Sequence, residues 1–163
     1  MQQKSSYSES DIADITRNQH DVNSQLPTGN MSVFDDITLI TKDEGLYGLG
    51  VVEAEYQIKP DHWYFDCHFP GDPIMPGCLG LDALWQLSGF YLRWLGHKGK
   101  GRALGSKDIK FFGEVLPSTQ FVTYRVHPKR ILIRDIKVIF ADGDVYADGK
   151  HIYSAKGLKV ALT

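Results

Sequence analysis

His68 and Asp82 are two side chains that can exchange protons, and they flank a stiff loop and the start of an apolar segment. A neutral imidazole is the usual general base near neutral pH. A carboxyl group held away from water takes up a proton readily and then acts as an acid. Prolines at 70, 73 and 76 restrict the backbone after His68 and lower the entropy cost of holding a site in place. The pair therefore predicts acid–base chemistry.

Each member of this pair also has a simpler interpretation. An isolated histidine is often structural. Asp82 lies near the start of a predicted helix, where a carboxylate that faces water is favoured by the helix dipole. The two residues have to be brought to one apolar cavity before they can act together.

The segment from about Gly77 to Leu95 is apolar in nearly every helical direction, which predicts a buried helix. It would span about 27 Å, the width of a small domain. Asp82 and Gln86 are four residues apart and share one helix face, so the Gln86 amide can orient the carboxyl group. The unpaired N–H groups at the helix start, with Gly77 leaving room beside them, form a candidate oxyanion site.

The rest of the chain predicts one short helix and several strands. Ser8 and Asp11 indicate a capping box, which opens a helix to about Thr16 before a polar loop. Alternation predicts strands over 46–58, around Phe111, over 120–140 in one or two pieces, and over 145–162. Asp-Gly pairs at 142–143 and 148–149 are interpreted as turns. The expected architecture is α+β, with one long helix wrapped by an antiparallel sheet.

Composition restricts the class of protein. The chain has 163 residues, of which 42% are hydrophobic, and a net charge of −2, which suits one domain and gives no global reason to expect nucleic acid or a membrane as a partner. The N-terminus has no apolar signal region and no stretch approaches a membrane span, so we expect a cytoplasmic protein. Cys67 and Cys78 are then free thiols.

Three segments together resemble a known family: HFPGDPIMPGCLGLDALWQ at 68–86, GKGRALG at 99–105 and GEVLP at 113–117. They are similar to the β-hydroxydecanoyl-acyl-carrier-protein dehydratase/isomerases of bacterial type II fatty-acid synthesis, in the same order and spacing. The similarity weakens before Asn30, which separates an N-terminal segment, 1–29, from a single domain, 30–163.

The resemblance implies a hot-dog fold, a homodimer and an active site shared between the two chains, with His68 from one and Asp82 from the other. In this family no cofactor is needed. His68 would remove the C2 proton of a 3-hydroxyacyl thioester, Gly77 would stabilise the oxygen, and protonated Asp82, oriented by Gln86, would help the hydroxyl leave. An aspartate rather than a glutamate at position 82 favours the branch that also isomerises the trans-2 product to the cis-3 enoyl thioester.

The substrate's fatty chain needs an apolar slot, and its carrier needs a docking surface. Phe69, Ile74, Leu81, Trp85 and Phe111 are the candidates for the slot, although a packed core has the same composition. The acyl carrier protein of this family is acidic, so a basic patch is expected to dock it. Its candidates, each of which also suits a solvated strand face, are Lys129, Arg130, Arg134, Lys137, Lys156 and Lys159.

Other kinds of site remain open. His62, Asp66, Cys67, His68 and Asp72 contain metal-ligand types but no zinc spacing, so no metal is expected. A Cys67 or Cys78 nucleophile paired with His68 would suit a thioesterase. A hot-dog module that binds an acyl thioester without turning it over is the non-enzymatic alternative.

Overall fold

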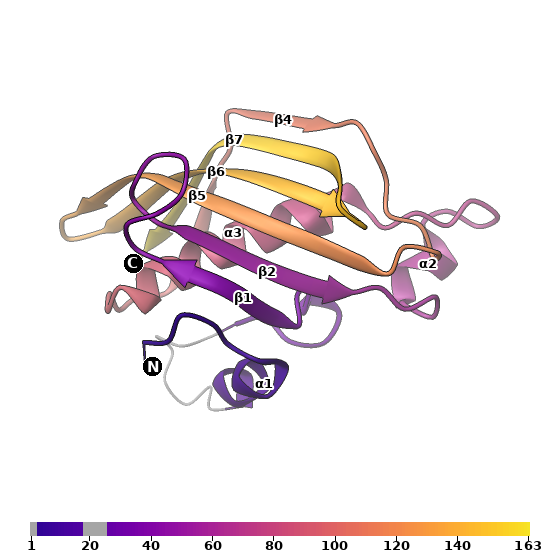
Figure 1. The fold of residues 1–163 in the computed structure, drawn as a ribbon, viewed down its shortest axis with the longest axis horizontal. Coiled ribbons are helices and arrows are strands. Elements are labelled where there is room, and N and C mark those ends of the chain that lie inside the picture. Colours follow the sequence, from indigo (N-terminus) through magenta and orange to yellow (C-terminus); the bar gives the residue numbers. More distant parts are fainter. Residues whose placement is uncertain (1–2, 18–25) are drawn as a thin grey trace.

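The computed structural model describes residues 3–17 and 26–163, and it contains a curved antiparallel sheet with one long helix on a single face (Figure 1). The sheet has 7 strands in the order β1-β2-β5-β6-β7-β3, and β4 pairs with β7. The predicted hot-dog fold is confirmed. The strands are β1 (Asp36–Thr41), β2 (Val51–Gln57), β3 (Gly101–Gly105), β4 (Asp108–Phe111), β5 (Phe121–Ile133), β6 (Lys137–Ala147) and β7 (Lys150–Leu162).

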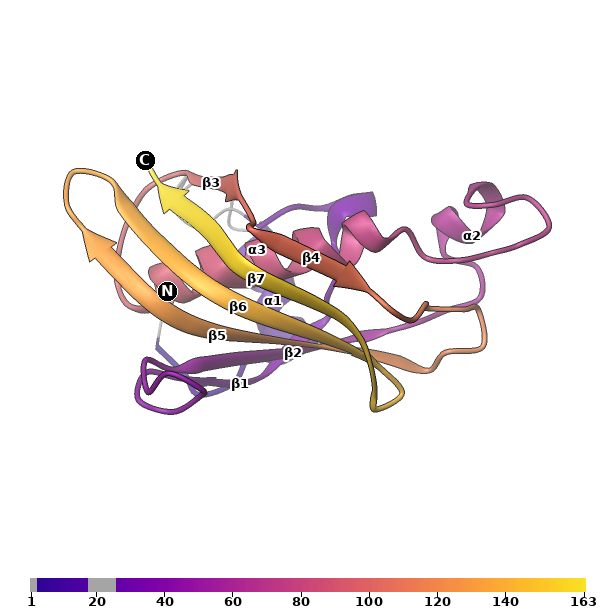
Figure 2. The same cartoon turned by 90° about the horizontal axis from the view of Figure 1, so that it is seen from above.

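The central helix α3 (Gly77–Trp94) begins and ends almost where the sequence predicts. Gly96, at φ 94°, ends it in the left-handed conformation that glycine adopts without strain. Seen from above, α3 runs along the hollow of the bent sheet (Figure 2). One stripe of the helix stays only partly covered, and it contains Leu81, Asp82, Trp85 and Gln86.

The three long strands β5, β6 and β7 form the middle of the sheet, and their alternation gives each strand an inner and an outer face. Ile139, Ala141 and Val145 are buried on the side of α3, whereas Phe140 and Asp142 lie on the outer side. Pro128 is tolerated within β5 because the register shifts between Pro128 and Arg130.

The predicted turn at Asp142–Gly143 is wrong, because both residues lie inside β6. Gly143 is needed there for packing: an added Cβ would come within 2.9 Å of Leu84 Cδ1. The real hairpin between β5 and β6 lies at residues 134–136, while the predicted turn at 148–149 is confirmed. The strand predicted over 46–58 begins only at Val51, and β1 was not predicted.

The N-terminal segment packs onto this domain. α1 (Glu9–Arg17) confirms the predicted helix, and its capping box is present, since the Ser8 N–H donates to Asp11 Oδ2 at 3.0 Å. Tyr7 exchanges two backbone hydrogen bonds with Ile37, and Trp94 Nε1 donates to the Lys4 carbonyl at 2.7 Å. Residues 18–25 of the predicted polar loop lie outside the described residues, and a short 3₁₀ turn, Gly29–Met31, follows them.

Candidate active site

His68 follows the short helix α2 (Trp63–Cys67) and begins the loop that leads into α3. Its Nδ1 lies 2.8 Å from the Ile74 carbonyl oxygen, and the Ile74 N–H donates back to the His68 carbonyl at 2.8 Å. Because a carbonyl oxygen can only accept, Nδ1 must carry the hydrogen, which leaves Nε2 of the neutral ring free to accept a proton. The loop therefore fixes both the orientation and the tautomer of a candidate base.

The same loop is held by backbone hydrogen bonds within itself and to the segment between β4 and β5. The Phe69 and Asp72 backbones bond each other at 2.8 and 2.9 Å, and the Met75 N–H donates to the Val115 carbonyl at 3.0 Å. The Phe69 ring stacks on the imidazole with centroids 4.0 Å apart. Phe69 is 52% exposed, so it shields His68 from one side rather than lining a cavity.

A pocket of about 500 Å³ opens beside His68. It contains four other residues that the sequence selected: Ile74, Gly77, Leu81 and Phe111. Gly77 is the first residue of α3, where N–H groups have no partner within the helix. A Cβ added at Gly77 would lie 2.7 Å from the Phe111 ring, so glycine lets this ring lie against the helix start. The pocket thus combines a base, apolar walls and backbone donors.

Asp82 and Gln86 interact as the sequence predicts. Gln86 Nε2 donates to Asp82 Oδ2 at 2.6 Å and to the Met31 carbonyl at 3.1 Å, so the amide is held from two sides. Asp82 is only half-buried within the single chain. A second pocket of about 710 Å³ runs along this stripe of α3, and Asp82, Trp85 and Gln86 line it.

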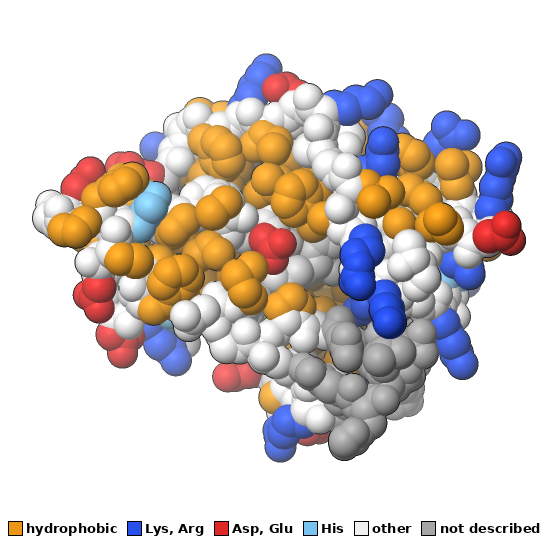
Figure 3. Space-filling view, turned by 180° about the vertical axis from the view of Figure 1, so that it is seen from behind, with side chains coloured by type: hydrophobic (Ala, Val, Ile, Leu, Met, Phe, Trp, Pro, Cys, Tyr) orange, Lys and Arg blue, Asp and Glu red, His pale blue; other side chains and the backbone are white. Residues whose placement is uncertain are grey.

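Within one chain the two candidate catalytic residues therefore line different pockets. His68, Ile74, Gly77, Leu81 and Phe111 belong to the first, and the Asp82 group belongs to the second. This face of the molecule, opposite to the view of Figure 1, carries apolar side chains across its centre with an acidic side chain among them (Figure 3).

Sequence reasoning missed Tyr153, which closes the His68 pocket from β7. Burial, followed by the nearby Cys78 and Glu114, raises the pKa of Tyr153 to about 12, so its hydroxyl stays protonated. Its ring packs on Gly80, where an added Cβ would lie 2.6 Å away. The glycine inside an otherwise bulky helix was the available signal, since such a glycine often marks a close contact.

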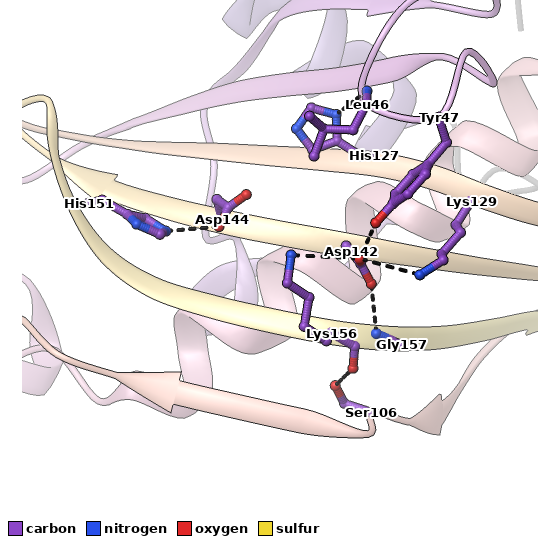
Figure 4. A network of polar contacts seen from close by, with 10 residues as sticks. All are labelled: Leu46, Tyr47, Ser106, His127, Lys129, Asp142, Asp144, His151, Lys156 and Gly157. Carbon is purple, nitrogen blue, oxygen red and sulfur yellow. Dashed lines mark hydrogen bonds and ion pairs between the residues drawn. The ribbon is translucent and has the colours of Figure 1, made fainter.

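The predicted docking residues gather on the outer side of the sheet, away from α3. Arg130 and Lys159 flank the Phe140 ring at 5.9 and 5.5 Å on three paired strands. Lys129 and Lys156 instead lie 3.9 and 3.6 Å from Asp142 (Figure 4). Arg134 lies in the hairpin, and Lys137 Nζ donates to the Asp135 carbonyl at the same end.

Asp142 is the centre of this outer network and is only 3% exposed. Burial by itself opposes its ionisation, but hydrogen bonds from the Tyr47 hydroxyl and the Gly157 N–H, with the charges of Lys156 and Lys129, lower its pKa. The two lysines that it holds are therefore partly neutralised. Within residues 3–17 and 26–163, no acidic side chain pairs with Arg130 or Lys159.

The described residues bear differently on each of the alternative sites. Among residues 3–17 and 26–163, no group of three or more potential ligands is placed to hold a metal ion. His62 is instead stacked between Tyr56 and Tyr64, at 5.1 and 5.3 Å. Cys67 and Cys78 are exposed free thiols, and Cys78 lines the same pocket as His68. No helix within the described part of the chain is both long and apolar enough to span a membrane.

Three solved structures share this architecture at low identity. A dehydratase heterocomplex, ApeI:P from Xenorhabdus doucetiae, matches with a TM-score of 0.60 and 12% identity over 84% of this chain and 86% of that chain. A trans-AT PKS dehydratase domain from Brevibacillus brevis gives 0.61 and 15% over 98% of this chain and 49% of that chain. A hypothetical thioesterase with coenzyme A from Streptococcus pneumoniae gives 0.55 and 16%, covering 78% and 84%.

These structures establish the fold, whereas the sequence itself establishes the family. The model of the FabA-like domain matches residues 26–156. This range includes the His68 loop, the whole of α3 and most of the sheet. The chain therefore belongs to the FabA-like domain family.

Proposed function

We propose that this protein dehydrates (3R)-3-hydroxyacyl thioesters carried by an acyl carrier protein. The observation that carries the proposal is the hydrogen bond from His68 Nδ1 to the Ile74 carbonyl, which leaves Nε2 as a base at a pocket that also contains the start of α3. Dehydratases among the structural neighbours and the FabA-like domain support the same reaction class.

The proposed reaction uses only side chains and backbone of this protein. His68 Nε2 takes the proton from C2, and the Gly77 N–H with the N-terminal end of α3 stabilises the negative charge that develops on the thioester oxygen. Asp82, oriented by Gln86, gives a proton to the 3-hydroxyl group, which leaves as water. The trans-2-enoyl thioester is the product.

Completion of the site requires two chains in this proposal. His68 and Asp82 line separate pockets of one chain, and Asp82 lies on the partly covered stripe of α3. A homodimer that buries this stripe would bring the His68 loop of one protomer to the Asp82 of the other and would withdraw Asp82 from water. That burial would favour the protonated acid that the mechanism needs.

A second step is proposed on the same groups. His68 would take a proton from C4 of the trans-2-enoyl product and C2 would be reprotonated, which gives the cis-3 isomer. Aspartate at position 82 motivates this step, and a hydroxydecanoyl chain is the proposed substrate. The carrier's acidic surface would dock on the outer basic residues, of which Arg130 and Lys159 lie beside the Phe140 ring rather than beside Asp142.

The test is an assay of enoyl absorbance with a 3-hydroxydecanoyl thioester, followed by analysis of the double-bond position. We expect His68→Ala and Asp82→Asn each to lower turnover by about 10²–10⁴-fold, the usual range for a general acid or base. Near-normal dehydration by either variant would remove that residue from the mechanism. Binding of the thioester without absorbance change would indicate a non-catalytic module, and release of free thiol would indicate a thioesterase.

A further inference from the structure

The pocket beside Asp82 continues along α3 to a basic end that the proposed mechanism does not use. Asp82, Trp85 and Gln86 form one part of its wall, and strand β3 with the preceding residue forms the opposite wall. Trp85 Nε1 donates to the Gly105 carbonyl at 3.2 Å and ties the helix to this strand. The residues at the basic end are Arg93, Lys100, Gly101, Arg102 and Ala103.

Two guanidinium groups lie near Gly101, and Lys100 is the residue before it. Arg102 Nη1 donates to the Gly101 carbonyl at 2.7 Å, and a Cβ added at Gly101 would lie 3.3 Å from Arg93 Nη2. Lys100 precedes them, and its backbone exchanges hydrogen bonds of 2.8 and 3.1 Å with Thr163, which fixes the start of β3. The backbone that carries Lys100 and Arg102 is therefore held by its pairing with β7 and the residue after it.

The charges of Lys100 and Arg102 have no acidic partner within the described ranges, 3–17 and 26–163. Both side chains are exposed at the pocket. This contrasts with Lys129 and Lys156 on the outer face, which share Asp142. The basic end of the pocket therefore offers two cations that no acidic side chain of the described residues compensates.

The distance along α3 between Asp82 and the basic end indicates how long a bound molecule must be to contact both. Asp82 and Arg93 are separated by about 16 Å along the helix axis at 1.5 Å per residue. An extended phosphopantetheine arm covers a similar length between its thioester sulfur and its phosphate. A thioester with its reacting carbons near Asp82 would therefore place that phosphate among the cations at the other end of the pocket.

We propose that Lys100 and Arg102 bind the phosphate of a phosphopantetheine thioester and so position its acyl group at Asp82. This inference rests on the proposed function and names a binding group for its substrate. Arginine and lysine suit the role because charged hydrogen bonds to phosphate are strong and arginine can make two in parallel. The phosphate is common to a carrier protein's prosthetic arm and to coenzyme A, and the assay separates these sources.

The neighbouring strand connects this site to the outer basic residues. β3 pairs with β7 such that Gly105 lies opposite Lys159 and Arg102 lies opposite Ala161. A carrier protein on the outer face would therefore have the β3 edge beside it, and its arm would reach the Asp82 pocket around that edge.

The test compares Lys100→Gln/Arg102→Gln with the matched control Lys42→Gln/Lys150→Gln, which removes the same charge from exposed positions outside both pockets. The same 3-hydroxyacyl group is presented on N-acetylcysteamine, 4′-phosphopantetheine, coenzyme A and the carrier protein. We expect KM for all three phosphate-bearing substrates to rise about tenfold to 100-fold in the first variant, with kcat nearly unchanged. The control variant should match the wild type on every substrate.

An equal KM for the Lys100/Arg102 variant and the wild type on 4′-phosphopantetheine thioester would overturn the proposal. A defect seen only with the carrier protein would also overturn it, because the residues would then contact the protein surface and not the phosphate. A defect that is equally large with N-acetylcysteamine would indicate damage to the acyl site. Calorimetric titration with an unreactive phosphopantetheine amide measures the same affinity difference even if no thioester is turned over.

Discussion

A mixed dimer gives the sharpest test of whether the active site is shared between chains. One protomer would carry His68→Ala and the other Asp82→Asn, each with a different affinity tag, so that tandem purification isolates mixed dimers only. If each site takes His68 from one chain and Asp82 from the other, one of its two sites has both residues intact. The second site has neither.

The expected turnover follows from this count. Each homodimeric variant should be slower than the wild type by about 10²–10⁴-fold, because every site lacks its base or its acid. The mixed dimer should recover about half of the wild-type rate per dimer, since a two-fold symmetric dimer has two equivalent sites. The separation of the two pockets within one chain is the structural basis of this expectation.

The control is a mixed dimer of wild-type chain and the double variant His68→Ala/Asp82→Asn. With shared sites, each of its sites lacks one residue and turnover stays near that of the single variants. With sites inside single chains, this control would be half active and the first mixed dimer would be inactive. That reversed pattern, measured by enoyl absorbance, would refute the shared site, and so would failure to recover any mixed dimer.

Three further predictions concern single residues. Replacing Gln86 with Leu should lower kcat by about tenfold with little change in KM, because Asp82 loses its 2.6 Å hydrogen bond; an unchanged kcat would contradict the orienting role. Gly80→Val should lower the free energy of unfolding, measured by urea denaturation, by about 1–3 kcal/mol, because the added Cβ would lie 2.6 Å from the Tyr153 ring. An unchanged denaturation midpoint would contradict that packing. Burial lowers the pKa of His127 below 6.5, so the unfolded chain binds the proton first and the free energy of unfolding should fall as the pH drops below about 6.5. His127→Gln should reduce this pH dependence, which denaturation at several pH values would measure.

The pH prediction has a structural mechanism in the outer network. Neutral His127 accepts a hydrogen bond from the Leu46 N–H at 3.4 Å, and the loop before β2 covers it (Figure 4). Asp144 and Asp142 favour the charged imidazole, whereas Arg125 and Lys156 oppose it together with burial. A protonated Nδ1 cannot accept from Leu46, so acid should loosen this loop first, which hydrogen exchange of its amides would measure.

Sequence alone predicted those features that depend on local pattern. The all-round apolar stretch gave α3 within one residue of its observed end, and the four-residue spacing of Asp82 and Gln86 predicted their hydrogen bond. The stiff loop after His68 was also foreseen, although its hydrogen bond to the Ile74 carbonyl was not. These features follow from helical periodicity and from restricted backbone angles, which act over a few residues.

Other features were decided only by contacts between distant segments. Asp142–Gly143 has the sequence of a turn, but it continues β6 because Gly143 admits Leu84 of α3 and the Tyr47 loop covers Asp142. The basic residues of β5 and β7 meet on the face of the sheet away from α3. Period-two alternation shows which residues of a strand share a face, but it does not show which face the helix covers. The division of the candidate catalytic residues between two pockets likewise depends on how the sheet wraps the helix, since packing between elements far apart in sequence sets which side chains share a cavity.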